Sequence, residues 1–235
     1  MDWNFFGNHI AVLSCVGDEK RRKRCKANMV RAGIDTSRVT WGNFRRKPGN
    51  NTIAENHMHF ARKAYEAGAE ALLVLEDDVE FFDERLADVA ACRRVMRAIK
   101  RTDEYDIFFL GHAALGPMIH TGRNIVRTSY PLTTHAYVLS RVGMKMLIDH
   151  VPQQHTSVDN WIAVNMSRKY AAFPSLAWQS VCHSVPKWCG PRGYLHLQNT
   201  LEYFWLILLY GTMALILAFL AWLVLRRRKS HLQYS

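Results

Sequence analysis

The sequence predicts an α/β fold with a mostly parallel central sheet, and three observations support this prediction. Short apolar runs at Ile10–Val16, Ala71–Leu75 and Tyr105–Leu110 are typical of strands buried on both faces. Longer stretches with helical periodicity separate these runs, as expected when helices cover the sheet. Acidic residues follow the Ala71–Leu75 run directly, and open α/β sheets bind ligands at the carboxyl ends of their strands.

Local signals define the individual elements. Gly17-Asp18 turns the chain out of the first strand, Gly33 is a natural helix C-cap, and Gly68 ends the helix before the Ala71–Leu75 strand. The expected elements are, in order, strand Ile10–Val16, helix Glu19–Ala32, strand Arg38–Phe44, helix Ile53–Ala67 with Thr52 as its cap, strand Ala71–Leu75, helix Asp83–Lys100, strands Tyr105–Leu110, Ile125–Ser129 and Thr134–Ser140, helix Arg141–His150, a helix capped by Ser157, and an extended segment from Phe173 to Gln179.

The acidic residues Glu76, Asp77 and Asp78 stand directly after the Ala71–Leu75 strand. Hard oxygen ligands suit Mg²⁺ or Mn²⁺, and such ions are commonly held by one or two carboxylates together with substrate phosphates. The alternative is that these acids are solvated loop residues or caps for the following helix. The sequence pattern alone leaves both interpretations open.

A basic run, KRRKRCK, opens the predicted Glu19–Ala32 helix. Such a run at helical spacing is usually a solvated face. The functional alternative is that Arg21, Arg22 or Arg24 lies near the carboxyl end of the first strand and neutralises a diphosphate. The net charge of +11 is compatible with a nucleotide diphosphate, nucleic acid or an anionic membrane surface, and does not choose among them.

In the predicted Ile53–Ala67 helix, Glu55 and His59 lie four residues apart on one face, whereas His57 points elsewhere. The spacing is not that of an HExxH zinc site, so zinc is not expected here. The five cysteines contain no CxxC pair and predict neither a zinc ribbon nor a disulfide framework.

Residues 203–225 carry no charged side chain and are followed by the basic cluster RRRK. This pattern predicts a transmembrane helix over 201–225, a globular domain over 1–200 and a short basic tail over 226–235. The amino terminus lacks the features of a signal peptide, so the domain is expected in the cytosol. The basic cluster after the span favours the lumen instead under the positive-inside rule.

These elements together resemble family 25 of the glycosyltransferases, which includes lipopolysaccharide and collagen galactosyltransferases. The match extends from the first strand to Gln179. The residues that carry it are Asp18, Arg21, Arg22 and Arg24, His57 ahead of Ala61 and Ala64, LVLEDDV at 73–79, THAYVLS at 134–140 with Gly143, Ser157-Val158-Asp159, and Pro174-Ser175-Leu176 with Gln179. The chain departs from the family at Ser14-Cys15, where asparagine-leucine is usual, and at Asn56, where serine is usual.

The resemblance implies a GT-A-like, nucleotide-sugar-binding fold, a donor that is usually a uridine diphosphate sugar, and a Mn²⁺ or Mg²⁺ cofactor. Asp78 is then the first metal ligand, with Asp77 and the later His183 as further candidates. Glu76 or Asp77 is expected to contact the ribose or a metal-bound water. Arg21 and Arg22 are expected to contact the donor.

The resemblance also implies transfer of a sugar, possibly galactose, to an acceptor hydroxyl of a glycan or protein with inversion at the anomeric carbon. Inversion by direct displacement needs a base on the acceptor hydroxyl. Asp159 is the better candidate because it belongs to a family-matching element, and Glu55 is the weaker one.

Two other functions are compatible with part of the sequence. A catalytically inactive, membrane-anchored homologue would keep the fold and act as a binding protein. A Mg²⁺-dependent nuclease would need a second, separated acidic cluster for a two-metal site. The basic run also lacks the interleaved aromatic residues expected of a single-strand binder, so no nucleic-acid partner is expected.

Overall fold

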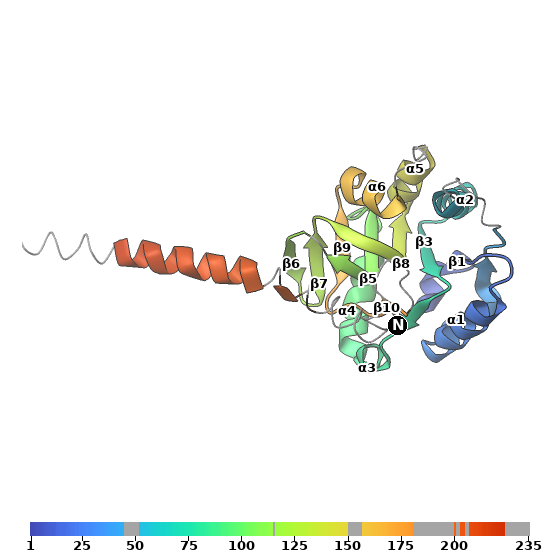
Figure 1. The fold of residues 1–235 in the computed structure, drawn as a ribbon, viewed down its shortest axis with the longest axis horizontal. Coiled ribbons are helices and arrows are strands. Elements are labelled where there is room, and N and C mark those ends of the chain that lie inside the picture. The colour runs from blue at the N-terminus through green and yellow to red at the C-terminus, as the bar shows by residue number, and fades with distance from the viewer. Residues whose placement is uncertain are drawn as a thin grey trace, which may run out of the picture.

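The computed structural model describes residues 1–44, 52–114, 116–149, 157–180, 200, 203–204 and 207–223. Its centre is an eight-stranded sheet flanked by helices (Figure 1). The strands of this sheet are β1 (Ile10–Leu13), β2 (Val39–Trp41), β3 (Ala71–Glu76), β5 (Ile107–Ala114), β6 (Met118–Gly122), β7 (Ile125–Thr128), β8 (Pro131–Ser140) and β9 (Lys169–Ala172).

The strand order in this sheet is β2-β1-β3-β8-β5-β9-β7-β6. β1 pairs in parallel with β2 and β3, and β5 pairs in parallel with β9. β8 runs antiparallel to both β3 and β5, and β7 runs antiparallel to both β6 and β9. Six of the eight strands therefore share one direction, which confirms the α/β prediction with a sheet that is mixed rather than purely parallel.

Helices cover both faces of the sheet (Figure 1). One face packs against α1 (Glu19–Arg31) and α4 (Val89–Ile99), whose apolar residues meet Ile10, Leu73 and Val138. The other face packs against α2 (Thr52–Glu66), α5 (Arg141–Asp149) and α6 (Val158–Asn165). Because β1 and the apolar part of β3 are buried on both faces, they contain apolar residues without alternation.

Two short strands form a separate ribbon beside the main sheet. β4 (Val79–Phe81) pairs antiparallel with β10 (Ala177–Gln179), with Val79 opposite Gln179. The Ser180 amide donates to the Asp78 carbonyl at 3.0 Å, and the Phe82 amide donates to the Leu176 carbonyl at 3.0 Å. The ribbon therefore ties the acidic turn to the segment that follows β9.

The helix expected over Asp83–Lys100 is two helices, α3 (Asp83–Ala87) and α4. Asp88 separates them with non-helical backbone angles, and its side chain accepts a hydrogen bond from the Ala91 amide at 2.9 Å. An aspartate that caps a new helix in this way competes with continuation of the preceding one. Two short 3-10 helices, η1 (Trp3–Phe6) and η2 (Thr36–Arg38), precede β1 and β2, respectively.

The expected transmembrane helix over 201–225 is a wrong prediction. Within the described residues, no helix is both long enough and apolar enough to cross a membrane. The single-pass anchor, and the membrane placement that followed from it, are therefore not supported.

Candidate active site

The candidate site lies where β3 ends and the chain turns into β4. The Asp77 amide donates to the Leu13 carbonyl at 3.1 Å, so the acidic turn stands next to the end of β1. Helix α1 begins a few residues after that end, at Glu19. The parallel pairing of β1 with β3 thus brings the first turn of α1 beside Asp77 and Asp78.

Arg21 of α1 bridges both aspartates. Its Nη2 atom is 2.5 Å from Asp77 Oδ1 and 2.9 Å from Asp78 Oδ2. Both aspartates are only 5% exposed, and burial raises their pKa values while Arg21 acts in the opposite direction. One guanidinium therefore forms ion pairs with two buried carboxylates.

The two carboxylate oxygens of Asp78 differ in their contacts. Its Oδ2 atom also accepts a hydrogen bond from Gln179 Nε2 at 3.1 Å. Its Oδ1 atom is buried and has no hydrogen-bond partner among the described residues. A buried carboxylate oxygen without a partner is costly, and this oxygen is available to a ligand.

Arg22 stabilises the acidic turn indirectly, through residues that follow β1 and β2. Its Nε atom donates to Ser14 Oγ at 2.9 Å and its Nη2 atom donates to Asn43 Oδ1 at 2.8 Å and to the Gly42 carbonyl. The Ser14 side chain in turn hydrogen-bonds Asp77 and opposes the rise that burial causes in the pKa of that carboxyl. Arg22 thus organises β1, β2 and Asp77.

Glu76 and Asp159 meet at Thr134 of β8. Thr134 Oγ1 lies 3.0 Å from Glu76 Oε1 and 2.9 Å from Asp159 Oδ1. The other Asp159 oxygen, Oδ2, accepts a hydrogen bond from the Thr133 amide at 3.1 Å. Asp159 stands in the first turn of α6, whose N-cap Ser157 accepts from the Asn160 amide. The sheet and α6 therefore unite two acids that are far apart in the sequence.

The shared hydroxyl also constrains where protons lie. A threonine hydroxyl has one proton, so it donates to only one of its two carboxyl neighbours, and the other must be protonated to donate back. Burial, with the nearby charges of Asp78 and Asp159, raises the pKa of Glu76 to about 8. Burial also raises the pKa of Asp159, but hydrogen bonds from Thr134 and the Thr133 amide oppose this rise. Glu76 is therefore the protonated partner at neutral pH. Asp159 is the carboxylate that accepts the hydrogen bond from the Thr134 hydroxyl.

A buried histidine and tyrosine lie beside this pair. His57 Nδ1 is 2.5 Å from the Tyr137 hydroxyl, and the two rings stack with centroids 5.8 Å apart. Burial lowers the pKa of His57 to about 3, and burial with the charges of Glu76 and Asp159 raises that of Tyr137. His57 is buried, whereas Glu55 on the same helix is exposed.

The structure brings some of the residues predicted from the sequence together and places others elsewhere. It brings together Arg21, Asp77 and Asp78 at the turn and Glu76 with Asp159 across Thr134. Arg22 lies behind the turn, Glu55 is on the surface of α2, and His183 lies outside the described residues. The sequence assigned no role to Ser14, Thr134 or Gln179, although two of them belong to motifs that carry the family resemblance.

The acidic turn is where the sequence places the expected divalent cation. Within the described residues, no group of three or more His, Cys, Asp or Glu side chains is arranged to hold a metal ion. Two carboxylates with a buried, unpartnered Asp78 oxygen still match a Mg²⁺ or Mn²⁺ site in which substrate phosphates supply the remaining ligands. The residues present fit the cation in donor type and charge.

Comparison with protein-family models and with curated protein sequences gives no match for this chain. Solved structures show weak similarity. A197 from STIV has 14% identity, a TM-score of 0.46, and coverage of 74% of this chain and 85% of that chain.

Two further solved structures are those of enzymes. A glycosyltransferase involved in the glycosylation of the major capsid of PBCV-1 has 13% identity, a TM-score of 0.44, and coverage of 75% of this chain and 94% of that chain. The mannose-1-phosphate geranyltransferase from Thermus thermophilus has 12% identity, a TM-score of 0.43, and coverage of 70% and 73%, respectively. Similarity at this level carries no functional conclusion by itself, and family 25 membership is not shown.

Proposed function

We propose that this protein is a glycosyltransferase that moves a sugar from a nucleoside diphosphate donor to an acceptor hydroxyl. The observation that carries the proposal is the convergence, at the carboxyl end of β3, of a paired acidic turn with the Glu76–Thr134–Asp159 cluster. The first group suits the donor diphosphate, and the second suits proton transfer from the acceptor.

The donor side consists of Arg21, Asp77 and Asp78. Asp78, with Asp77, would hold a Mn²⁺ or Mg²⁺ ion, which when bound stabilises the negative charge of the departing diphosphate as a Lewis acid. Arg21 is 27% exposed at its side chain and lies at the rim of the turn, where it can contact phosphate oxygens as well as the two aspartates. Glu76, neutral at this position, uses its one proton toward Thr134 and keeps an oxygen that can accept a hydrogen bond from a ribose or sugar hydroxyl.

The acceptor side centres on Asp159, which accepts hydrogen bonds from the Thr133 amide and the Thr134 hydroxyl and stands at the N-terminus of α6. Both features favour its carboxylate form. In the proposed step the acceptor oxygen bonds to the anomeric carbon as the bond to the diphosphate oxygen breaks. The acceptor proton passes to Asp159, and attack opposite the leaving group inverts the anomeric centre.

The proposal is tested by incubating the full-length chain with uridine and guanosine diphosphate sugars, with and without Mn²⁺, and measuring nucleotide release and donor binding. Release from one donor is the expected result. Donor binding without release, with or without added glycan or protein acceptors, would instead favour a catalytically inactive homologue that acts as a binding protein.

A further inference from the structure

The residues around Asp159 form the part of the site that an acceptor would contact. In the proposed transfer Asp159 takes the acceptor proton, so the body of the acceptor has to rest on residues next to this carboxylate. Its neighbour along the chain is Asn160, which is exposed. Its neighbours across space are Thr133 and Thr134, which both form hydrogen bonds with it. Tyr130 stands three residues before Thr133 and contacts Asn160, so it belongs to the same surroundings.

Tyr130, immediately before β8, is held at both ends of its side chain. Its hydroxyl lies 3.2 Å from Asn160 Oδ1. A Cβ atom placed on Gly116 would lie 3.0 Å from Tyr130 Cβ, so the Gly116 backbone packs against the base of the tyrosine. Tyr130 is nevertheless only half-buried and still presents surface to solvent. A side chain that is already fixed loses little conformational entropy when a ligand contacts it.

Thr133 contributes a buried hydroxyl group next to Asp159. Its backbone lies in the left-handed region, with a φ angle of 67°, which is uncommon for a β-branched residue. In this conformation its amide donates to Asp159 Oδ2 at 3.1 Å. Thr133 Oγ1 is buried and has no hydrogen-bond partner among the described residues. Strained backbone and unsatisfied polar atoms are both concentrated at ligand-binding positions.

We propose that Tyr130, Asn160 and Thr133 bind a sugar ring of the acceptor, so that the acceptor is a glycan rather than a protein side chain. A sugar ring has an apolar C–H face and a rim of hydroxyl groups. The Tyr130 ring is complementary to the apolar face. The Asn160 amide has two N–H donors besides the oxygen that faces Tyr130, and these donors with the Thr133 hydroxyl are complementary to the rim. This assignment rests on the proposed function, because Asp159 marks the acceptor side only if it is the base.

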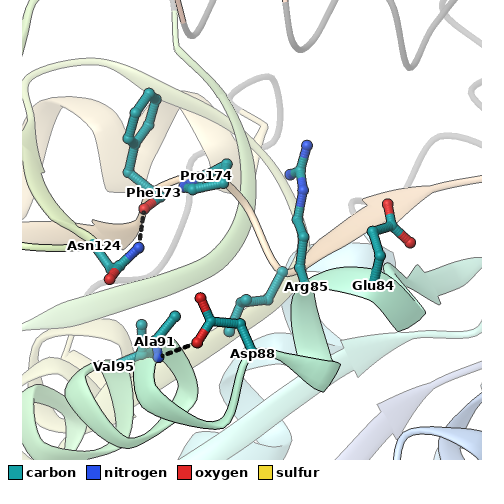
Figure 2. Close-up of a pocket in the computed structure, with 9 residues that line it drawn as sticks. Glu84, Arg85, Asp88, Ala91, Val95, Asn124, Phe173 and Pro174 are labelled. Atoms are coloured by element: carbon teal, nitrogen blue, oxygen red, sulfur yellow. Dashed lines mark hydrogen bonds between the residues drawn. The ribbon is translucent and has the colours of Figure 1, made fainter.

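A pocket in another part of the molecule supplies a control. It lies between α3 and α4 and the segment that joins β9 to β10, and has a volume of about 160 Å³ (Figure 2). Glu84 lines it, and Asn124 Nδ2 in its wall donates to the Phe173 carbonyl at 3.2 Å. A small saccharide that bound here would respond to a change at Glu84 and not to one at Tyr130.

The test is saturation-transfer NMR of the full-length protein with methyl β-D-galactopyranoside, methyl β-D-glucopyranoside and N-acetylthreonine amide. Each probe is titrated alone and again with Mn²⁺ and uridine or guanosine diphosphate. At least one glycoside is expected to bind, and the threonine derivative is expected to bind at least about tenfold more weakly, because it has no ring to stack on Tyr130. No glycoside binding under either condition, or equal binding of the threonine derivative, would overturn the proposal.

Three variants locate the glycoside. Tyr130→Ala removes the aromatic face and is expected to weaken glycoside binding by about five- to tenfold, whereas Tyr130→Phe keeps the ring and should weaken it by about threefold or less. Glu84→Gln alters the other pocket and should leave glycoside affinity unchanged. Equal affinity in wild type and Tyr130→Ala, or weaker binding only in Glu84→Gln, would refute the assignment.

This readout is separate from the test of the proposed function, because it measures saccharide binding and needs no turnover. Nucleotide release from a sugar donor without glycoside binding at Tyr130 would refute the acceptor assignment and leave glycosyl transfer standing. Glycoside binding that depends on Tyr130, in a protein that neither binds nor cleaves any donor, would support the saccharide site and contradict the proposed function.

Discussion

Glu76 and Asp159 share one hydrogen-bond partner, the Thr134 hydroxyl, at 3.0 and 2.9 Å. Glu76 ends β3 and Asp159 lies in the first turn of α6, so only the tertiary fold brings the two acids together. Their unequal surroundings keep Glu76 protonated and leave Asp159 as the proton acceptor. This division of roles between two neighbouring carboxyl groups is a recurring arrangement in acid–base catalysis.

Thr134→Val removes the shared hydroxyl at nearly constant volume. Turnover is expected to fall by about 10- to 100-fold with little change in donor affinity, because proton transfer rather than donor binding is disturbed. Steady-state measurement of nucleotide release tests this. Thr128→Val is the matched control, since Thr128 is buried with a hydroxyl that has no partner among the described residues. Equal turnover in the two variants would argue against a role for the shared hydroxyl.

Asp78→Asn tests the donor side. The amide retains a contact for Gln179 but removes the charge, so Mn²⁺-dependent binding of the donor is expected to weaken by at least about tenfold. Chelation with EDTA should weaken donor binding to the wild-type protein and leave the variant almost unaffected. Fluorescence titration with a labelled nucleoside diphosphate measures both effects, and the exposed Asp83→Asn serves as the control. Identical Mn²⁺ dependence in wild type and Asp78→Asn would exclude Asp78 as a ligand.

Glu76→Gln is expected to change how stability depends on pH. The folded-state pKa of Glu76 is about 8 against an ordinary value of 4.5, so the folded state binds more protons than the unfolded state between these values. Wild-type stability therefore includes a contribution from Glu76 that decreases as pH rises through this range, by up to ~1.4 kcal/mol per pH unit.

The glutamine variant lacks this decrease and should gain stability relative to wild type between pH 5 and about 8. Urea denaturation at several pH values measures it, with the exposed Glu66→Gln as the control. Parallel pH profiles for wild type and Glu76→Gln would show that Glu76 is not held neutral.

The buried histidines predict loss of stability in acid. Burial lowers the folded-state pKa values of His57 and His112 to about 3 and that of His135 to about 4, from an ordinary value of 6.5. Their contribution is therefore present above pH 6.5 and lost as pH falls toward the folded-state values. His57→Gln is expected to reduce the slope by up to ~1.4 kcal/mol per pH unit.

His59→Gln is the matched control for this experiment, because His59 is exposed on the same helix two residues away. Denaturation profiles between pH 7.5 and 5 compare the two variants. A slope that changes equally in both would show that burial of His57 is not the cause.

Most of the sheet could be predicted from the sequence because strands buried on both faces leave uninterrupted apolar runs. β3 begins at Ala71 as expected, and β8 includes the predicted Thr134–Ser140 strand. β6 was missed because only Met118 is buried and the rest of this edge strand is exposed, so the strand has no buried apolar run. The break at Asp88 was missed because helical periodicity continues on both sides of it.

The site could be predicted in part. Acids directly after a buried strand identified the turn, and the basic start of α1 identified Arg21, because both signals are local. The partnership of Asp159 with Glu76 depends on β8 lying between β3 and β5, which is a tertiary relationship that local pattern does not contain. The apolar composition of 203–225 likewise predicted a membrane span, whereas no helix among the described residues is long and apolar enough to cross a membrane.

The most direct test of glycosyl transfer at this site is nucleotide release by wild-type protein and Asp159→Asn, measured together with donor affinity. The wild type is expected to release nucleotide from one sugar donor. The variant is expected to bind that donor with unchanged affinity and to release nucleotide at least about 100-fold more slowly, because the acceptor proton has no base. Equal release by the two proteins, or no donor binding by the wild type, would contradict the proposed function.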